Sequence, residues 1–332
     1  MVHRSFAKTA AAIGLFVAIG AGQAWAKRVV EYRGICDASA AVALSSDRFV
    51  VADDEQDWLS IYRIGQPKAL GVVPLGEFFA HKKGEGKEAD IEGAARIGDR
   101  IYWISSHGRN GDGELKASRL RFFVTRVVGD GEAAKVEPPA TAPYAGLLQA
   151  LVADPRFEPL ARADAAGLPP KAAGGLNIEG LAATPEGGLL IGFRNPLPAG
   201  KAMLVPLLNP AAVVDGTAQP QFGDTILLDL GQRGVRSIEW IRGRYVIAAG
   251  PFGAEGGGEP GSDFALFTWS GRAGETAMRV PRVALGDLKP EALFEIPGTS
   301  RVHVLSDDGA ACKQGKVSAK KRRFRGIVVD MP

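Results

Sequence analysis

The sequence is poor in the residue types that build metal and redox centres. Only two cysteines, Cys36 and Cys312, and four histidines occur among its 332 residues. Paired-cysteine metal motifs, a glycine-rich phosphate loop and a nucleophile elbow are all missing. His107 lies in a polar segment and His303 in a distant apolar one, which is a poor set of ligands for zinc. The sequence therefore argues against the common zinc, P-loop and α/β-hydrolase enzymes.

Long apolar runs are missing after the first 26 residues. His3, Arg4 and Lys8 give a basic start, residues 9–22 are apolar or small, and Ala24-Trp25-Ala26 is typical of a cleavage site. This pattern predicts a secretory signal peptide at 1–26, because the apolar run is too short to span a membrane. We therefore expect a periplasmic or secreted bacterial protein that begins near Lys27 and has no membrane span.

A strong excess of one charge is also missing. The formal charge is +3, and it falls to +1 when Arg4 and Lys8 leave with the signal peptide. This small net charge does not indicate whether the protein binds anions. Local clusters of charge must indicate that. We expect no nucleic-acid partner in the predicted compartment, and we expect a monomer.

What the sequence has is a repeat. The segment "DIEGAARI" at residue 90 recurs as "NIEGLAAT" at 177, "SIEWIRG" at 237 and, more weakly, "KPEALFEI" at 289. Each copy is followed by a turn and a second apolar segment, such as "RIYWISS" or "RYVIAAG", and "DASAAVAL" at 37 begins a divergent fifth copy. Short strands at this period predict an all-β fold, a β-propeller of five four-stranded blades, with six blades as the alternative.

The predicted propeller comprises residues 27–332 as one domain. A ring must close to protect its strand edges, so we expect residues 28–34 to pair with 325–331 in the last blade. Residues 143–170 do not fit the repeat, because Leu147, Leu148 and Leu151 have helical spacing. We expect a helical insertion there, either capping the side of the propeller or forming a lid over the site.

The recurring glutamates are the main candidates for function. In a propeller, the first strand of each blade starts on the face where the second strand ends, so Glu92, Glu179, Glu239 and Glu291 are predicted to converge near the axis. Polar residues at the ends of the second strands are predicted to surround them as ligand-binding or catalytic groups: Asp53, Asp54, His107, Arg109, Arg194, Asn195, Asp307 and Asp308.

Four carboxylates near one axis would repel each other and need compensation. A calcium ion takes six to eight oxygen ligands and is the candidate cofactor. Arg194 and Arg236, the latter also a predicted ligand-binding residue, are an alternative source of positive charge. Two further alternatives are that the glutamates accept hydrogen bonds from neighbouring backbone N–H groups, and that they contact a substrate directly.

Two other features carry chemistry. His107 and Arg109 are candidate catalytic residues, because histidine titrates near neutrality, although a structural loop is the alternative. The segment "CKQGKVSAKKRRFR" at 312–325 is predicted to form a basic rim that attracts anions, or simply a solvated loop.

The two cysteines are predicted to form a disulfide. Cys36 precedes the first strand of the first blade, and Cys312 follows the second strand of the last blade. Closure of the ring makes these blades neighbours, and both positions lie on the same face. An oxidising compartment allows the pair to form.

Several of these segments resemble a known family. "GICDASAAVAL", "FVVADDE", "DIEGAARIGDRIYWISSHGRNGDGE", "LNIEGLA", "IGFRNP" and "RSIEW" resemble the bacterial secreted family called domain of unknown function 3616, over most of the mature chain. The "IEG" strand openings are more weakly similar to esterase-like phytase propellers, which implies a phosphoester or ester hydrolase.

We therefore predict a propeller that binds a small or anionic ligand over the central opening of one face, with calcium as its candidate cofactor. A metal-assisted phosphoester or carboxylic ester hydrolase is one alternative. A protein-interaction scaffold is another, and the fold alone does not choose among them.

Overall fold

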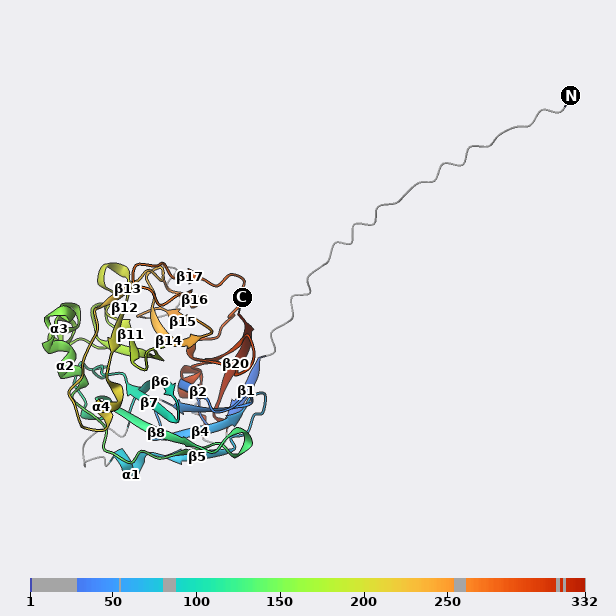
Figure 1. Cartoon of the computed structure of the whole chain (residues 1–332), viewed down its shortest axis with the longest axis horizontal. Coiled ribbons are helices and arrows are strands. Elements are labelled where there is room, and N and C mark those ends of the chain that lie inside the picture. The colour runs from blue at the N-terminus through green and yellow to red at the C-terminus, as the bar shows by residue number, and fades with distance from the viewer. Residues whose placement is uncertain are drawn as a thin grey trace.

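The fold is a five-bladed β-propeller. The computed structural model describes residues 1, 29–53, 55–79, 88–253, 261–314, 317–318 and 321–331. Five four-stranded antiparallel sheets surround a common axis, and the labels of β2, β6 and β14 lie near the centre of Figure 1 while those of β5, β13 and β17 lie at its rim. The predicted all-β class and the five blades are confirmed. The predicted signal peptide and Asp54 lie outside the described residues.

The blades follow the order of the sequence. Blade 1 consists of β2 Ala38–Ala43, β3 Arg48–Asp53, β4 Trp58–Arg63 and β5 Gly71–Pro74. Blade 2 consists of β6 Ile91–Ile97, β7 Arg100–Ser105, β8 Phe122–Val128 and β9 Lys135–Glu137. Blade 3 consists of β10 Asn177–Ala183, β11 Leu189–Asn195, β12 Ala202–Leu207 and β13 Ile226–Leu228.

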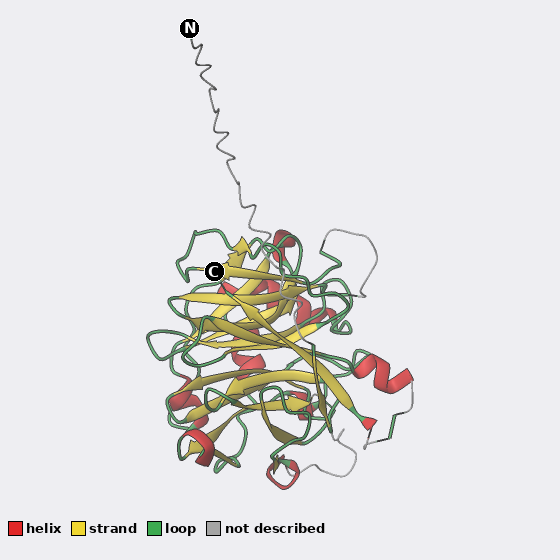
Figure 2. Cartoon of the chain, turned by 90° about the vertical axis from the view of Figure 1, so that its right-hand side faces the viewer, coloured by secondary structure: helices red, strands yellow, loops and turns green. Residues whose placement is uncertain are grey.

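The last two blades complete the ring. Blade 4 consists of β14 Gly234–Ile241, β15 Arg244–Gly250, β16 Ala265–Trp269 and β17 Met278–Arg279. Blade 5 consists of β18 Pro290–Glu295, β19 Arg301–Ser306, β20 Arg323–Asp330 and β1 Val30–Arg33. The helices are short: α1 Gly76–Phe79, α2 Leu147–Ala153, α3 Glu158–Ala166, α4 Pro210–Val214 and α5 Gly309–Gln314. A side view shows them in the connections around the strands (Figure 2).

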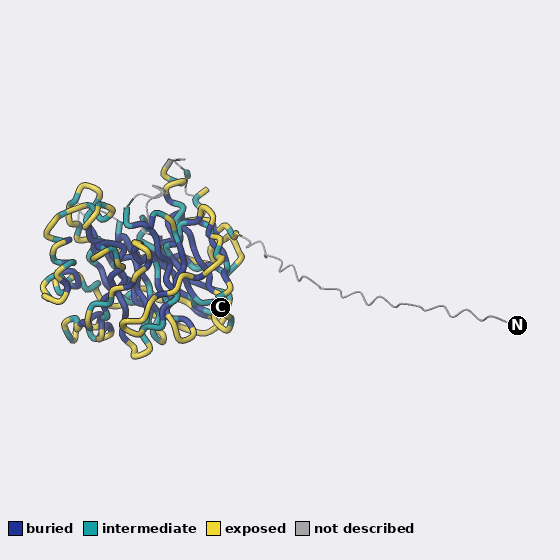
Figure 3. Tube along the Cα trace, turned by 90° about the horizontal axis from the view of Figure 1, so that it is seen from above, coloured by how far each residue is buried: buried dark blue, intermediate teal, exposed yellow. Residues whose placement is uncertain are grey.

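The core lies between adjacent blades. The first strands β2, β6, β10, β14 and β18 each contact the first strand of the next blade, and β18 contacts β2 to close the circle. Apolar side chains of neighbouring sheets pack face to face, and Figure 3 shows the buried chain gathered inside an exposed rim. This packing is typical of a propeller, in which each sheet buries both of its faces.

Strand pairing joins the two ends of the chain. Strand β1 pairs antiparallel with β20, with Val30 opposite Gly326 and Arg33 opposite Arg323. The predicted closure is confirmed, with a register that uses 323–326 rather than the later part of β20. The predicted disulfide is also confirmed: Cys36 and Cys312 are bonded, with their Cα atoms 6.5 Å apart. A disulfide fits a protein that folds outside the reducing cytoplasm.

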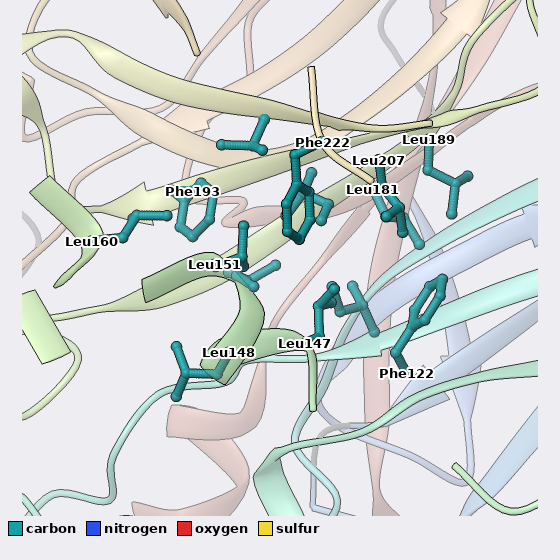
Figure 4. Close-up of a cluster of buried hydrophobic side chains, with 14 of the residues drawn as sticks. Phe122, Leu147, Leu148, Leu151, Leu160, Leu181, Leu189, Phe193, Leu207 and Phe222 are labelled. Atoms are coloured by element: carbon teal, nitrogen blue, oxygen red, sulfur yellow. The ribbon is translucent and has the colours of Figure 1, made fainter. Parts of the chain in front are cut away.

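The predicted helical insertion is confirmed and lies between blades 2 and 3. Leu147, Leu148 and Leu151 of α2 are buried with Leu160 of α3 in one apolar cluster. Figure 4 shows these side chains facing Phe193 and other residues of the blades. The insertion therefore caps the side of the propeller. In the described part of the chain, no helix is long and apolar enough to cross a membrane.

Candidate functional site

Every first strand carries a one-residue bulge near its start. The register with the second strand slips by one residue at this point in all five blades. A bulge turns one side chain away from the regular alternation. The bulged residues are Ser39, Glu92, Glu179, Arg236 and Glu291. They share one place in each blade, on the face where the first strands begin, which we call the upper face.

The bulged residues of blades 3, 4 and 5 form a buried network of charges. Arg236 Nε lies 2.9 Å from Glu179 Oε2, and the same guanidinium contacts Glu291. Arg194, bulged from β11, places Nη1 2.8 Å from Glu179 Oε1. Burial lowers the pKa of Arg236, and the negative charge of nearby Glu92 partly opposes this fall. We call Glu92, Glu179, Arg194, Arg236 and Glu291 the charge ring.

The structure corrects the prediction for Glu239. We expected it to occupy the place of Glu92 and Glu179, but Arg236 is the residue at the bulge of blade 4. Glu239 lies three residues further along β14, where Oε2 accepts a 2.5 Å hydrogen bond from the Glu295 backbone N–H. Burial there raises the pKa of Glu239 to about 8. The "IEW" match was misleading because it paired identical letters rather than equivalent strand positions.

A better signal was present in the sequence. The residue after each bulge is small, and these residues are Ala40, Gly93, Gly180, Ser237 and Ala292. A Cβ added to Gly180 would lie 2.6 Å from Val235 Cγ1 of the next first strand, so the small residue allows the strands to approach. Trp240, which follows Glu239, breaks this rule, whereas Ser237 after Arg236 obeys it.

Backbone carbonyls close the charge ring from above. Arg194 Nε donates to Pro251 O at 3.1 Å, and its Nη2 donates to Gly253 O at 3.3 Å. Arg236 Nη1 also donates to Pro251 O at 3.3 Å. Burial and the neighbouring Arg194 lower the pKa of Arg236 to about 10, against the opposing pull of Glu179, so it stays charged at neutral pH. The ring is thus a compensated ionic network that fills the axis.

This donor set does not fit the predicted calcium site. Glu179 and Glu291 both bind Arg236, whereas calcium takes six to eight oxygen ligands without a competing guanidinium. In the described part of the chain, no group of three or more His, Cys, Asp and Glu residues is arranged to hold a metal ion. The arginine alternative accounts for the geometry, and calcium binding stays a prediction.

His107 and Arg109 lie in one loop but face different partners. His107 is 1% exposed and its Nδ1 lies 2.8 Å from Ser105 O, while burial lowers its pKa to about 4. It is therefore neutral at physiological pH. Arg109 binds Asp164 of α3 at 3.2 Å and anchors the helical insertion. Neither contact bears on catalysis, and a catalytic role for either residue stays a prediction.

Two of the predicted aspartates, Asp53 and Asp307, lie with Asp37 where blade 1 meets blade 5. The backbones of Asp37 and Asp307 pair as an isolated β-bridge, and the Asp53 carboxylate accepts hydrogen bonds from the backbone N–H groups of Cys36 and Glu55. Burial raises the pKa of Asp53 to about 6. Burial and the charge of Asp307 raise the pKa of Asp37 to about 8. We call Asp37, Asp53 and Asp307 the acidic junction.

Asn195 lines a pocket beside the charge ring. Its Nδ2 donates to Pro170 O at 3.0 Å and to Ala172 O at 2.6 Å, which ties the end of β11 to the segment after α3. A pocket of 580 Å³ opens there on the upper face, over blades 3 and 4. We call it the upper pocket. Its lining includes Arg162, Ala166, Asn195, Gln232 and Phe252.

Sequence reasoning missed most of the upper pocket. It identified Asn195 but not the wall supplied by α3, nor Gln232 and Phe252 at the edge of blade 4. These residues belong to connections of different blades, and the loop lengths did not indicate that they meet. One available signal was the insertion itself, because a helix beside one blade end adds a wall to a flat face.

Comparison with family models identifies one family. Residues 125–300 match the model of a family described as "Protein of unknown function (DUF3616)". The glutaminyl cyclase of Myxococcus xanthus is similar at 14% identity, with a TM-score of 0.45 over 91% of this chain and 96% of that one. The PQQ-bound aldose sugar dehydrogenase of Streptomyces coelicolor is similar at 12% identity, with a TM-score of 0.43 over 91% and 99%.

A third structure is a fungal allergen. The major allergen Mala s 1 of Malassezia sympodialis shares 9% identity, with a TM-score of 0.49 over 90% of this chain and 96% of that one. No curated protein matches the chain. At these identities and scores, the likenesses to solved structures carry no argument about chemistry, which must come from the site.

Proposed function

This chain belongs to the DUF3616 family, whose function is unknown, and we propose that it binds a small molecule with an apolar body and one polar or anionic end in the upper pocket. The single observation that carries this proposal is the pocket itself, which measures 580 Å³. Ligand pockets of about 300–1,000 Å³ with mostly apolar walls and a few polar groups are the usual sites for small molecules.

Two polar side chains of the upper pocket, Gln232 and Arg162, can contact a ligand. In the described part of the chain, no hydrogen bond engages the side-chain amide of Gln232. Arg162 pairs with Glu158 one helical turn away, and both side chains are exposed. Such a pair contributes only about 0.3–0.5 kcal/mol, so an anionic ligand can take its place. The apolar walls, the amide of Gln232 and the weakly paired Arg162 together favour a molecule with one polar end.

The backbone around the pocket is held in uncommon conformations. Ala199 and Gln232 both have positive φ angles, of 52° and 61°. A non-glycine residue with positive φ is strained, and such residues cluster at ligand sites. Asn195 fixes the facing segment through its bonds to Pro170 and Ala172. The pocket is therefore shaped before a ligand arrives, which lowers the cost of binding.

Binding is favoured over hydrolysis at this site. Among the described residues that line the upper pocket there is no Ser, Thr, Cys, His, Asp or Glu. Nucleophilic and general acid–base catalysis both need such side chains at the substrate. The charge ring lies next to the pocket, but its guanidinium and carboxylate groups are paired with one another. The hydrolase and scaffold alternatives have no observation of comparable weight.

The dye 1-anilinonaphthalene-8-sulfonate, with an apolar body and one sulfonate, tests the proposal. Ala166→Trp fills the pocket and is expected to weaken dye binding about tenfold, equivalent to 1.4 kcal/mol. Ala165→Trp is the matched control, because Ala165 is exposed on the same helix but does not line the pocket. Fluorescence titration measures both. Equal binding by the two variants would place the dye elsewhere and refute the proposal.

We also propose that the protein is exported. The disulfide between Cys36 and Cys312 and the basic, apolar N-terminal sequence both support this location. Intact mass of the protein recovered from the periplasm or medium is expected to correspond to a chain beginning near Lys27. A full-length chain confined to the cytoplasm, with both thiols free, would contradict it.

A further inference from the structure

A second pocket lies over blade 5, away from the upper pocket. It measures 710 Å³ and opens beside β1, β20 and α5. Its lining includes Arg33, Lys321, Arg323, Arg325 and Cys312. We call it the basic pocket. Four cations around one concave surface strengthen the local positive field, because low-dielectric walls focus it.

Two arginines oppose each other across the strands that line the basic pocket. Arg33 of β1 and Arg323 of β20 are directly paired in the ladder, so their side chains leave the same face of the sheet. Like charges in this position destabilise a sheet. A residue pair of this kind calls for a compensating negative charge between or above the two guanidinium groups.

Within the described part of the protein, only a weak ion pair provides negative charge to these two arginines. In the described part of the chain, Arg33 has no ion-pair partner. Arg323 Nη1 lies 3.8 Å from Glu31 Oε2, and both side chains are at least half exposed. Surface pairs at such distances contribute about 0–1 kcal/mol. Both guanidinium groups are thus available to a bound anion.

Arg325, which lines the same pocket, is by contrast paired with two aspartates. Its Nε and Nη2 lie 2.9 Å and 2.7 Å from the two oxygens of Asp308, and its Nη1 lies 2.8 Å from Asp287. The hydrogen bonds that Arg325 donates to Asp308 raise the pKa of Arg325. These contacts also occupy Asp287 and Asp308, the two aspartates of the lining. Those two acids are therefore already neutralised, and Glu31, the third acid of the lining, is only weakly paired with Arg323.

The wall of the basic pocket is covalently fixed. Cys312 belongs to the lining, and its bond to Cys36 ties α5 to the start of blade 1. Asp308 N–H donates to Cys36 O at 3.1 Å, and Val317 N–H donates to Cys312 O at 3.1 Å. A wall held in this way loses little freedom when a ligand binds.

We propose that the basic pocket binds a compact polyanion with two or more phosphate-like groups, gripped by Arg33 and Arg323. A planar guanidinium binds phosphate through two parallel hydrogen bonds, and two opposed guanidiniums match two such groups. The volume of the pocket exceeds what a single phosphate fills. The site is separate from the upper pocket and does not depend on the function proposed there.

Isothermal titration with inorganic pyrophosphate tests the assignment. Saturable binding is expected at low salt, with weaker binding at high salt because the site is open to screening. Arg33→Gln and Arg323→Gln are each expected to weaken binding by about fivefold or more, through loss of a charge-assisted bidentate contact. Arg301→Gln is the control, since Arg301 is exposed at the other end of the same blade. No saturable heat, or an equal loss in the control, would overturn the proposal.

Two further arms separate a built site from general attraction. Arg33→Lys keeps the charge but loses the fork, so it is expected to weaken pyrophosphate binding almost as much as Arg33→Gln. The variant Cys36→Ser with Cys312→Ser releases the wall and is expected to weaken binding, while circular dichroism reports whether the blades remain folded. Full affinity in Arg33→Lys would reduce the pocket to a nonspecific basic patch and contradict the proposal.

Discussion

In blades 3, 4 and 5 the buried carboxylates of the upper face bind guanidinium groups, whereas at the acidic junction of blades 1 and 5, burial and neighbouring acids raise the pKa of Asp37. Glu179 contacts both Arg194 and Arg236, and Glu291 shares Arg236. Asp37 instead lies against Asp307 and takes a raised pKa, about 8, from burial and that charge. Neighbouring parts of one face thus compensate buried acids in two different ways.

The difference shows that position in the blade does not fix the electrostatics. Where a bulge or a second strand supplies an arginine, the guanidinium groups contact the buried carboxylates and compensate their charge. Around Asp37, burial and the charges of Asp307 and Asp53 raise the pKa to about 8, so a proton supplies the compensation at neutral pH. Removing Arg236 from the charge ring should therefore lower the free energy of unfolding. Removing Asp37 from the acidic junction should raise it at high pH.

The largest expected effect comes from Arg236→Met. This change leaves Glu179 and Glu291 buried with one guanidinium fewer, and breaking a buried ionic network costs about 3–5 kcal/mol of unfolding free energy. Urea denaturation measures the loss. Arg244→Met, at an exposed position in the same blade, is the control.

A second substitution shows whether this loss arises from uncompensated charge. Adding Glu291→Gln to Arg236→Met removes one orphaned carboxylate and should recover part of the stability, as a double-mutant cycle will show. A loss below about 1 kcal/mol in Arg236→Met would mean that the charge ring does not act as a compensated network.

A smaller loss is expected for Glu179→Gln. The amide keeps the shape and part of the hydrogen bonding, while Arg236 retains Glu291, so we expect about 2–3 kcal/mol. Because guanidinium groups already compensate Glu179, the loss should be equal with calcium and with chelator. Glu186→Gln, in the exposed turn of blade 3, is the control. A loss seen only with calcium would establish a metal site, since a ligand stabilises the state it binds.

Much of the fold could be predicted because the sequence repeats the segment that forms each blade. Alternating apolar strands and the closing segment at 28–34 were enough for five blades and for the disulfide between Cys36 and Cys312. Arg236 was named as an alternative source of positive charge, but its place at the bulge of blade 4 was harder to predict, because a bulge is a backbone feature and does not select one residue type. The partners of Asp37 and the wall supplied by α3 depend on contacts between distant loops, which periodicity does not encode.

The stability contributed by the acidic junction should depend on pH. Asp37 has a folded pKa of about 8, above its unfolded value of about 4, so the folded state holds an extra proton between these values. Unfolding free energy should therefore fall as pH rises from about 5 to about 8, by at most about 1.4 kcal/mol per unit for this group.

The variant Asp37→Asn isolates this contribution from that of other acids. It should be less sensitive to pH and, above about pH 8, more stable than the wild type by about 1–2 kcal/mol, because it removes a buried negative charge. Asp130→Asn, at an exposed turn, is the control. Urea titrations across the range measure the difference, and parallel curves for wild type and Asp37→Asn would show that Asp37 is ionised in both states.

The smallest effect is expected for Glu239→Gln, which sharpens the comparison because Glu239 was predicted to belong with Glu179. Part of the side chain reaches the surface, but protein surrounds its carboxyl group, and this burial raises the pKa to about 8. At neutral pH the group is therefore protonated, and glutamine can accept the same hydrogen bond from the Glu295 backbone N–H. Denaturation at about pH 7 should show a change within about 1 kcal/mol, and above the pKa the variant should be the more stable form, because only the wild type then buries a charge. A loss of stability as large as that of Glu179→Gln would instead mean that Glu239 is ionised and paired. Glu239 would then resemble the carboxylates of the charge ring, despite its different place on β14.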